Sequence, residues 1–308
     1  MSLELLLAAA LVAATPVLFA AQGELLAERS GVLNLGLEGT MLIGAVNGFA
    51  ATQAFGSVWA GIAAALVAGA LFGLAFAFLV VTLRLDQVVT GLAFTILGGG
   101  LSALIGKPYV GMAPRATVPT PDLGPLGDLP FLGRVLFSQD ILVYAALLLT
   151  AAVAFYLKRT RPGLVLRALG ESPDVLDTLG IPVAALRYAY VVTGAALAGL
   201  GGAYLSLAYT PSWIENMTAG RGWIAIALVI FATWRPWWVL GGAILFGAVV
   251  ALRFRAQVGG HPIVDPHFLN MLPYIATLVV LALVSRSVVR RRLGVPAALG
   301  VAYDREQR

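Results

Sequence analysis

The stretch from residue 31 to residue 83, GVLNLGLEGTMLIGAVNGFAATQAFGSVWAGIAAALVAGALFGLAFAFLVVTL, contains a single charged side chain, Glu38. A helix rises 1.5 Å per residue, so about 20 apolar residues cross the hydrocarbon core of a bilayer. The stretch is therefore long enough for two membrane spans. We expect helices over 36–54 and 57–83.

The composition extends this conclusion to the whole chain. Of 308 residues, 60% are hydrophobic and 11% are charged, whereas a soluble domain carries roughly 25% charged residues. A soluble globule is excluded because so much apolar surface needs lipid as its solvent. The absence of cysteine excludes disulfides, thiolate metal sites and cysteine nucleophiles. The net charge of +5 does not indicate a nucleic-acid partner, because the basic residues are scattered at the edges of apolar runs.

The remaining charge-free runs predict an all-α, polytopic transmembrane bundle with about nine spans, eight to ten being compatible with the pattern. We expect one domain over 1–308. The segments 222–234 and 237–252 look too short for simple spans, and we expect the first helix to be retained because Glu4 stands where a signal peptide has basic residues. The predicted helices are 3–20, 36–54, 57–83, 87–106, 141–157, 187–209, 222–234, 237–252 and 271–286.

The distribution of basic residues orients this bundle. The loop 158–187 and the tail after 285 are rich in Lys and Arg, and such segments remain in the cytoplasm. With nine spans the N-terminus and the Pro/Gly-rich loop 107–140 then lie outside, and the C-terminus lies inside. We predict a multi-pass protein of the bacterial cytoplasmic (inner) membrane.

The cytoplasmic loop contains a short predicted helix near 173–179. Ser172 can cap it, Pro173 suits its first position, and Gly180 supplies a stop. Two turns are too few to be stable alone in water, so the helix needs a docking partner. It is either a lever moved by a cytoplasmic subunit or a surface helix lying on the membrane or on its own bundle. Its apolar face consists of Val175, Leu176 and Leu179, and Asp174 belongs to its polar face.

Three segments resemble the permease subunits of bacterial ABC importers, in the superfamily that serves branched-chain amino acids, ribose-like sugars and nucleosides. They are SGVLNLGLEGTMLIGA at 30–45, RALGESPDVLDTLGIP at 167–182 and NMTAGRGWIAIA at 216–227. The sequences of these three segments are most similar to those of the nucleoside or simple-sugar permeases. A branched-chain amino acid permease is the alternative within the superfamily, and a secondary ion-coupled transporter is the alternative outside it.

The resemblance implies the partners of this chain. It implies a separate ABC ATPase, a second permease subunit that is homologous or identical, an external substrate-binding protein or lipoprotein, and the lipid bilayer. The chain contains no G-x-x-x-x-G-K-[ST] phosphate loop. We therefore expect it to be no enzyme and to bind no cofactor, with ATP and Mg on the partner ATPase.

The resemblance also assigns the loop matching 167–182 to a coupling helix that enters a groove on the ATPase. The residues expected to take part in coupling are Gly170, Glu171, Ser172, Pro173, Asp174, Val175, Leu176, Leu179 and Gly180.

Glu38 is the one acid expected inside the bundle, and it allows two interpretations. An intramembrane charge marks a substrate path or gate by default. The alternative is local: Asn34 caps the second helix and the dipole of that helix favours the carboxylate. The candidates for a substrate path or gate are Asn34, Glu38, Asn47, Trp213, Glu215 and Asn216.

Aromatic and polar residues are interleaved in the external segment 213–223. They could stack on a nucleobase, but tryptophan at a membrane boundary is normally a headgroup anchor. The same anchoring role is expected for Trp234, Trp237 and Trp238 at a cytoplasmic turn. His261, Asp265 and His267 have a loosely metal-like spacing without a further ligand nearby, so we expect no metal site.

A short internal similarity suggests an inverted repeat. Gly36-x-x-Gly39 opens an apolar run leading to Leu71-Phe72-Gly73, and Gly220-x-Gly222 opens another leading to Leu245-Phe246-Gly247. In the predicted topology the two units enter from opposite sides of the membrane. Transporters built in this way place the substrate path at the repeat interface.

Overall fold

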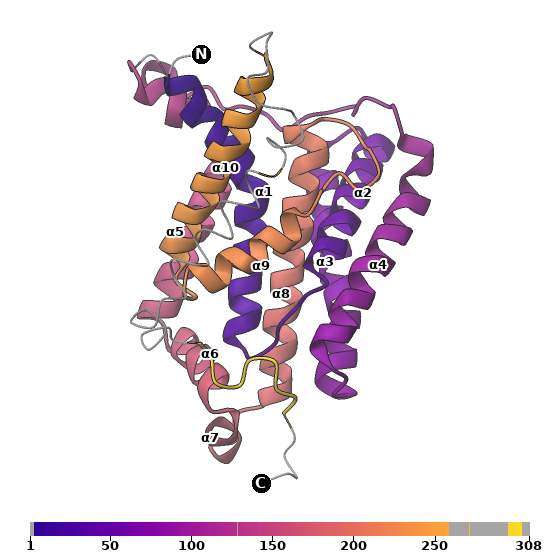
Figure 1. Ribbon diagram of the computed structural model, residues 1–308, viewed down its shortest axis with the longest axis vertical. Helices are drawn as coiled ribbons and strands as arrows, with labels where there is room; N and C mark the ends of the chain where they lie inside the picture. Colours follow the sequence, from indigo (N-terminus) through magenta and orange to yellow (C-terminus); the bar gives the residue numbers. More distant parts are fainter. Residues whose placement is uncertain (1–2, 128, 259–270, 272–294, 304–308) are drawn as a thin grey trace.

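The computed structural model describes residues 3–127, 129–258, 271 and 295–303, which form helices and connecting segments without a β-strand (Figure 1). Short π-helical turns, Phe78–Thr82 and Leu205–Tyr209, extend α3 and α8. The loop 107–140 holds three further short turns, Lys107–Tyr109, Gly124–Leu126 and Gly133–Phe137. The α-helices are α1 Leu3–Arg29, α2 Leu37–Phe55, α3 Val58–Ala77, α4 Gln87–Gly106, α5 Ile141–Arg159, α6 Arg161–Glu171, α7 Pro173–Thr178, α8 Val183–Tyr204, α9 Arg221–Phe231 and α10 Pro236–Val258.

The all-α polytopic bundle is confirmed, although the count of nine spans is not. Six described helices are long and apolar enough to cross a membrane, namely α1, α3, α4, α5, α8 and α10. The prediction that 237–252 is too short was wrong, since α10 covers Pro236–Val258, whereas α9 is short, at 11 residues. Helix α6 was not predicted. The predicted helix 271–286 lies outside the described residues except for Met271.

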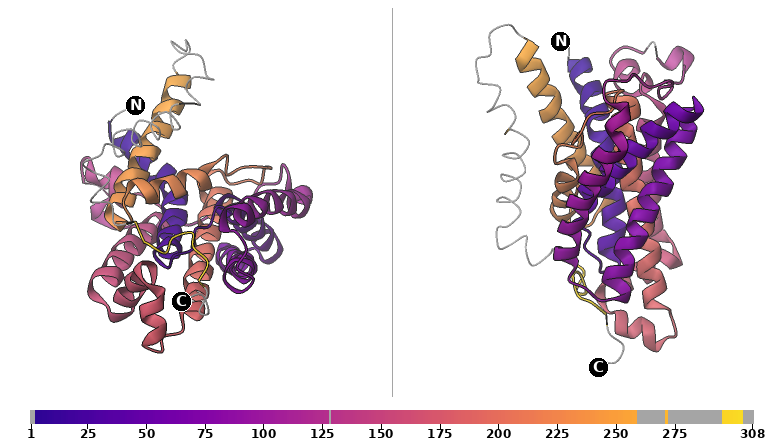
Figure 2. Two further views of the ribbon diagram at one scale, coloured as in Figure 1. Left: turned by 60° about the horizontal axis from the view of Figure 1, so that its bottom comes forward. Right: turned by 90° about the vertical axis from the view of Figure 1, so that its right-hand side faces the viewer.

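Helices α1 and α8 form the centre of the bundle. Figure 2 shows α2–α4 on one flank and α5–α7 with α10 on the other, with α1 and α8 between them. The two central helices meet at Gly23 and Gly194, where a Cβ on Gly194 would lie 2.5 Å from the carbonyl oxygen of Gly23. Only glycine permits this approach, which brings the two backbones into van der Waals contact at this crossing.

Two of the polypeptide's passages through the bundle are discontinuous. After α1 the chain runs through the linker 30–36, and α2 begins only where that linker ends. After α8 and its π turn, residues 210–220 lead back into the bundle to the start of α9. Figure 1 shows that α2 then rises toward the end of the molecule where α1 begins, whereas α9 descends toward the opposite end.

The packing around these passages supports the predicted inverted repeat. The units α1–α2–α3 and α8–α9–α10 run in opposite directions (Figure 1). Helix α3 packs on α8, and α10 packs on α1. The two glycines of the sequence similarity sit at these equivalent contacts, because Gly73 faces Ala195 of α8 and Gly247 faces Ala10 of α1.

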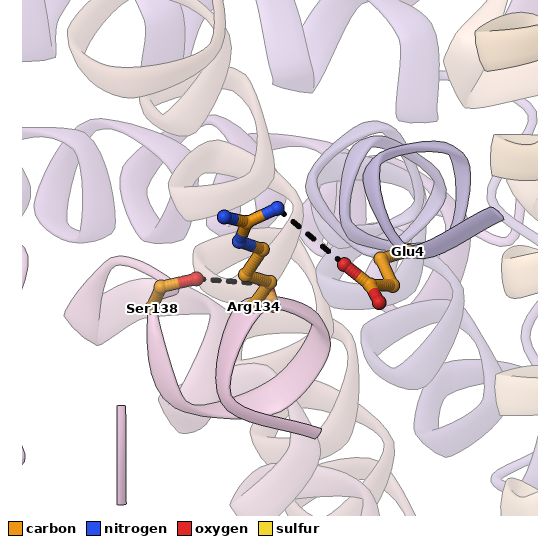
Figure 3. Close-up of polar contacts among 3 residues, drawn as sticks. All are labelled: Glu4, Arg134 and Ser138. Atoms are coloured by element: carbon orange, nitrogen blue, oxygen red, sulfur yellow. Dashed lines mark hydrogen bonds and ion pairs between the residues drawn. The ribbon is translucent and has the colours of Figure 1, made fainter. Parts of the chain in front are cut away.

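The start of α1 and the loop 107–140 lie at one end of the bundle, and α6, α7 and residues 295–303 lie at the other (Figure 1). Arg134 of the loop places its Nη1 3.6 Å from Oε2 of Glu4, and its carbonyl accepts a hydrogen bond of 2.7 Å from Ser138 (Figure 3). The ion pair is partly exposed and contributes little stability. It nevertheless places the loop beside the start of α1.

Cysteine labelling tests the orientation predicted from charge. Ser172 and Thr120 are both exposed and lie at the two opposite ends. Because the chain has no native cysteine, we expect Thr120→Cys to react with an impermeant thiol reagent added outside intact cells and Ser172→Cys to react only after the membrane is opened. Labelling of Ser172→Cys from outside would reverse the orientation.

Candidate functional site

The carboxylate of Glu38 joins the starts of the two helices that begin inside the bundle. Glu38 lies in the first turn of α2 and is 5% exposed. It accepts hydrogen bonds from the backbone N–H of Gly220 at 2.7 Å, from that of Gly222 at 2.6 Å, and from the hydroxyl of Thr218 at 2.5 Å. We call these four residues the Glu38 junction.

The chemistry of a helix start explains the junction. The first N–H groups of α9 have no partner within their own helix, and the helix dipole makes that end electropositive. A buried carboxylate satisfies both requirements. Glycine is needed opposite it, because a Cβ on Gly222 would lie 2.5 Å from the backbone nitrogen of Glu38, and Gly220 has a φ of 83°.

The local interpretation of Glu38 expected Asn34 to cap α2, and this capping was wrong. Asn34 does not cap α2; instead its Oδ1 accepts a 3.0 Å hydrogen bond from Gly36 N–H and closes a turn in the linker. The dipole that meets the carboxylate at hydrogen-bond distance belongs to α9, in the other repeat unit. Glu38 therefore connects two distant segments of the chain.

Side chains from neighbouring helices satisfy the buried backbone of the linker 30–36. The N–H of Leu33 donates to Oε1 of Gln87 at 2.8 Å, and the N–H of Asn34 donates to Oε1 of Glu24 at 2.9 Å. The carbonyl of Leu35 accepts from the hydroxyl of Thr95 at 2.9 Å. Non-helical backbone survives at membrane depth only where such partners, or water, replace the missing helical bonds.

Two acids that the sequence pattern did not place in the bundle are buried on α1. Glu24 is 1% exposed and Glu28 is 0% exposed, and Oε2 of Glu28 accepts a hydrogen bond from the indole of Trp234 at 2.5 Å. They were missed because the first helix was expected to end at residue 20. Their i, i+4 spacing within a continuing helical pattern was the signal that could have placed them on one face.

The tryptophans at 213 and 234 are not headgroup anchors. Trp213 is 0% exposed and packs against Gly106, and its backbone pairs with that of Val110. Trp234 is 3% exposed and its indole is held by Glu28. Trp237 and Trp238 remain exposed, at 52% and 66%, as an interfacial position requires.

The other predicted path residues do not join the Glu38 junction. Glu215 and Asn216 are exposed in the segment before it. Asn47 lies about three turns into α2, and its side-chain amide donates a hydrogen bond to the carbonyl of Ile43 in the same helix. The segment reaches the junction through left-handed backbone at Asn216 and Ala219, with φ of 55° and 46°.

Comparison with known proteins identifies the chain. Residues 6–284 match the family described as "Branched-chain amino acid transport system / permease component". The chain belongs to this permease family. It is thus a component of a transporter, a multi-pass protein of the cytoplasmic (inner) membrane, and not itself an enzyme.

Curated relatives match along nearly their whole length. The chain is 41% identical to the "Putative glucose ABC transporter permease protein TsgC13" of Haloferax volcanii, covering 98% of each chain. It is 34% identical to the "Guanosine ABC transporter permease protein NupQ" of Bacillus subtilis, covering 97% of this chain and 98% of that one. It is also 34% identical to the "Nucleoside ABC transporter permease protein NupC" of Lactococcus lactis, covering 92% of each. No solved structure was found to match.

The loop 158–187 contains the expected short helix, α7, with one correction to its apolar face. Leu176 is 4% exposed and belongs to the core, whereas Val175 and Leu179 are 56% and 70% exposed. Gly180, with φ of 76°, ends the helix as predicted, and its N–H donates to the carbonyl of Asp177 at 3.0 Å. The side chain of Ser172 makes no capping hydrogen bond.

The C-terminal segment 295–303 links this loop to the linker 30–36. The N–H of Ala298 donates to the carbonyl of Gly170 at 2.8 Å, and the N–H of Gly300 donates to the carbonyl of Gly31 at 3.2 Å. Arg187 of α8, 2% exposed, donates to the carbonyl of Val301 at 3.2 Å. Gly170 is therefore a packing residue, while Glu171, Ser172 and Asp174 are exposed and Pro173 is half-buried.

Replacement of Glu38 by glutamine tests the junction. The substitution keeps the size of the side chain, removes its charge and turns one acceptor into a donor that faces a backbone N–H. Hydrogen bonds to charged groups contribute about 1.5–3 kcal/mol, so we expect Glu38→Gln to be about 2 kcal/mol less stable than the parent and to melt at a lower temperature in detergent. The matched control is Glu215→Gln, an exposed acid of the segment before the junction. Equal melting of the two variants would show that the junction does not stabilise the fold.

Proposed function

We propose that this chain is the pore subunit of an ATP-driven importer for nucleosides or simple sugars. The observation that carries the proposal is the full-length similarity to permeases whose names specify guanosine, nucleosides and glucose. The proposed assembly contains a separate ABC ATPase, a second homologous or identical permease and an external substrate-binding protein. ATP and Mg would be bound by the ATPase.

We further propose a route for the coupling of ATP to transport. The exposed Val175 and Leu179 dock in a groove of the ATPase, and closure of the ATPase displaces α6 and α7. The displacement passes from Gly170 through the C-terminal segment 295–303 to Gly31. There it reaches the linker 30–36 and, at the end of that linker, the Glu38 junction.

In this mechanism Glu38 moves two half-helices as one unit and does not bind substrate itself. Within the described residues, the carboxylate accepts hydrogen bonds from Thr218, Gly220 and Gly222, and 5% exposure leaves little surface for a solute. Glu38→Gln should therefore lower the uptake of every accepted substrate by a similar factor. A loss confined to one substrate would favour direct contact.

Reconstitution tests the function itself. The permease is placed in proteoliposomes with its ATPase and binding protein, and uptake of labelled guanosine and glucose is measured with ATP inside and with an ionophore present. We expect uptake of at least one of these solutes to require ATP and to be insensitive to the ionophore. Uptake that runs on an ion gradient without the ATPase would identify a secondary transporter instead.

The exposed face of α7 provides the variants that test coupling. Val175→Asp places a charge in the proposed apolar groove at a cost of a few kcal/mol, or roughly a hundredfold in affinity. We expect normal membrane levels, little co-purifying ATPase and no ATP-driven uptake. The control is Val67→Asn, a polar change at an exposed valine of α3 outside the proposed docking surface, which should leave ATPase binding intact. If the ATPase co-purifies with Val175→Asp as well as with the parent, α7 is not the coupling element.

A further inference from the structure

A basic cavity of about 450 Å³ lies at the end of the bundle that carries α6 and α7. It is bounded by the ends of α1 and α5, by α6 and by the turn between α9 and α10. No carboxylate belongs to its described lining. The residues that line it are Arg29, Ala154, Leu157, Lys158, Arg167, Trp234, Arg235, Pro236, Trp237 and Trp238.

The cations of this cavity are balanced only in part by nearby acids. Glu171 and Glu28 interact electrostatically with Arg29, but neither belongs to the described lining of the cavity. Arg29 donates through Nη2 to the carbonyl of Trp234 at 3.1 Å, but its buried Nε has no partner among the described residues. Lys158, Arg167 and Arg235 are exposed, and none of them forms an ion pair within the described part of the chain. Like charges around one cavity repel one another, so an anion bound between them would be stabilised.

The indole groups indicate what kind of anion this is. Trp237 and Trp238 lie exposed in the first turn of the membrane-spanning helix α10, and Lys158 lies in the last turn of the membrane-spanning helix α5. Tryptophan at the ends of spans sits at the level of lipid headgroups. A cavity lined by both guanidinium groups and indoles matches a molecule that is anionic at one end and apolar at the other.

We propose that this cavity binds the phosphate of an anionic phospholipid, with the acyl chains lying against Trp237 and Trp238. The guanidinium groups of Arg167 and Arg235 donate hydrogen bonds to the phosphate oxygens, for which their planar fork is well suited. A free phosphate would bind the cations but make no apolar contact with the indoles. An acidic segment of the ATPase could bind the cations as well, but it would not explain two exposed indoles at the end of a membrane span.

The bound lipid would stabilise the turn that joins α9 to α10. Trp234 lines the cavity and lies shortly after the end of α9. Its carbonyl accepts a hydrogen bond from Arg29, and its indole donates one to Glu28. Lipid composition would thereby act on the half-helix whose other end is held by Glu38.

The test is a titration of the delipidated, full-length permease in neutral detergent. Dioctanoyl phosphatidylglycerol, dioctanoyl phosphatidylcholine and inorganic phosphate are added separately, and binding is followed by tryptophan fluorescence. Each basic residue near a membrane surface contributes about 1 kcal/mol to attraction of an anionic lipid, or roughly fivefold in affinity. We expect phosphatidylglycerol to bind at least about tenfold more tightly than either of the other two.

Variants connect this binding to the cavity. The double variant Arg167→Gln/Arg235→Gln should weaken phosphatidylglycerol binding by roughly 25-fold. The matched control is Arg159→Gln, which removes an exposed cation at the same end of α5 that does not line the cavity. If the double variant does not fold, Lys158→Gln alone should weaken binding about fivefold.

Several outcomes would overturn the proposal. Equal affinity for the two lipids, or equal weakening by the control, would exclude an anionic-lipid site here. Inorganic phosphate binding as tightly as phosphatidylglycerol would make the cavity a site for a soluble anion. Loss of ATPase co-purification in the double variant with unchanged lipid binding would assign the cavity to the ATPase interface.

Discussion

Backbone that is not helical has to find partners for its N–H and C=O groups when it runs inside an apolar bundle, because neither lipid nor hydrocarbon side chains can supply them. The linker 30–36 is such a stretch, and its partners come from two surrounding helices: Glu24 on α1, and Gln87 and Thr95 on α4. The start of α9 is another, and its partner is Glu38 on α2. Each polar side chain in this set therefore fixes the path of a discontinuous segment.

This arrangement suits a protein that has to open a path through itself. A continuous helix is held by its own hydrogen bonds and resists local change, whereas a half-helix is held at one end by a few side-chain contacts. Here the starts of α2 and α9 are joined by one carboxylate, so in the proposed mechanism movement of either helix is passed to the other. The C-terminal segment 295–303 connects the linker before α2 to the last turn of α6 through hydrogen bonds to the carbonyls of Gly31 and Gly170. The proposed coupling route therefore follows covalent and hydrogen bonds from α7 to the linker.

The sequence predicted the features that depend on local pattern. Runs without charge located α2 to α5 and α8, and the Pro173 and Gly180 positions located α7. Glu38 stood out because a lone acid in an apolar run is conspicuous. Its partners could not be predicted, because they lie about 180 residues away along the chain and only the folded bundle brings them together.

The errors have a common origin in tertiary contacts. Leu176 and Val175 are equivalent in the helical pattern, and only packing against the core decides that Leu176 is buried. Trp213 and Trp234 flank apolar runs, as headgroup anchors do, but Gly106 leaves room for the first and Glu28 provides a hydrogen bond for the second. Glu24 and Glu28 lay beyond the predicted end of the first helix because acids signalled its end, although the fold supplies buried partners for both.

Amide hydrogen exchange measures the central contact most directly. The N–H groups of Gly220 and Gly222 should be protected in the parent by the carboxylate of Glu38, and in Glu38→Gln their exchange should accelerate at least about tenfold, which corresponds to a loss of roughly 1.4 kcal/mol. Amides in the middle of α8 serve as the internal reference and should not change. Unchanged protection of Gly220 and Gly222 in Glu38→Gln would contradict the account, because the start of α9 would then be held by something other than this carboxylate.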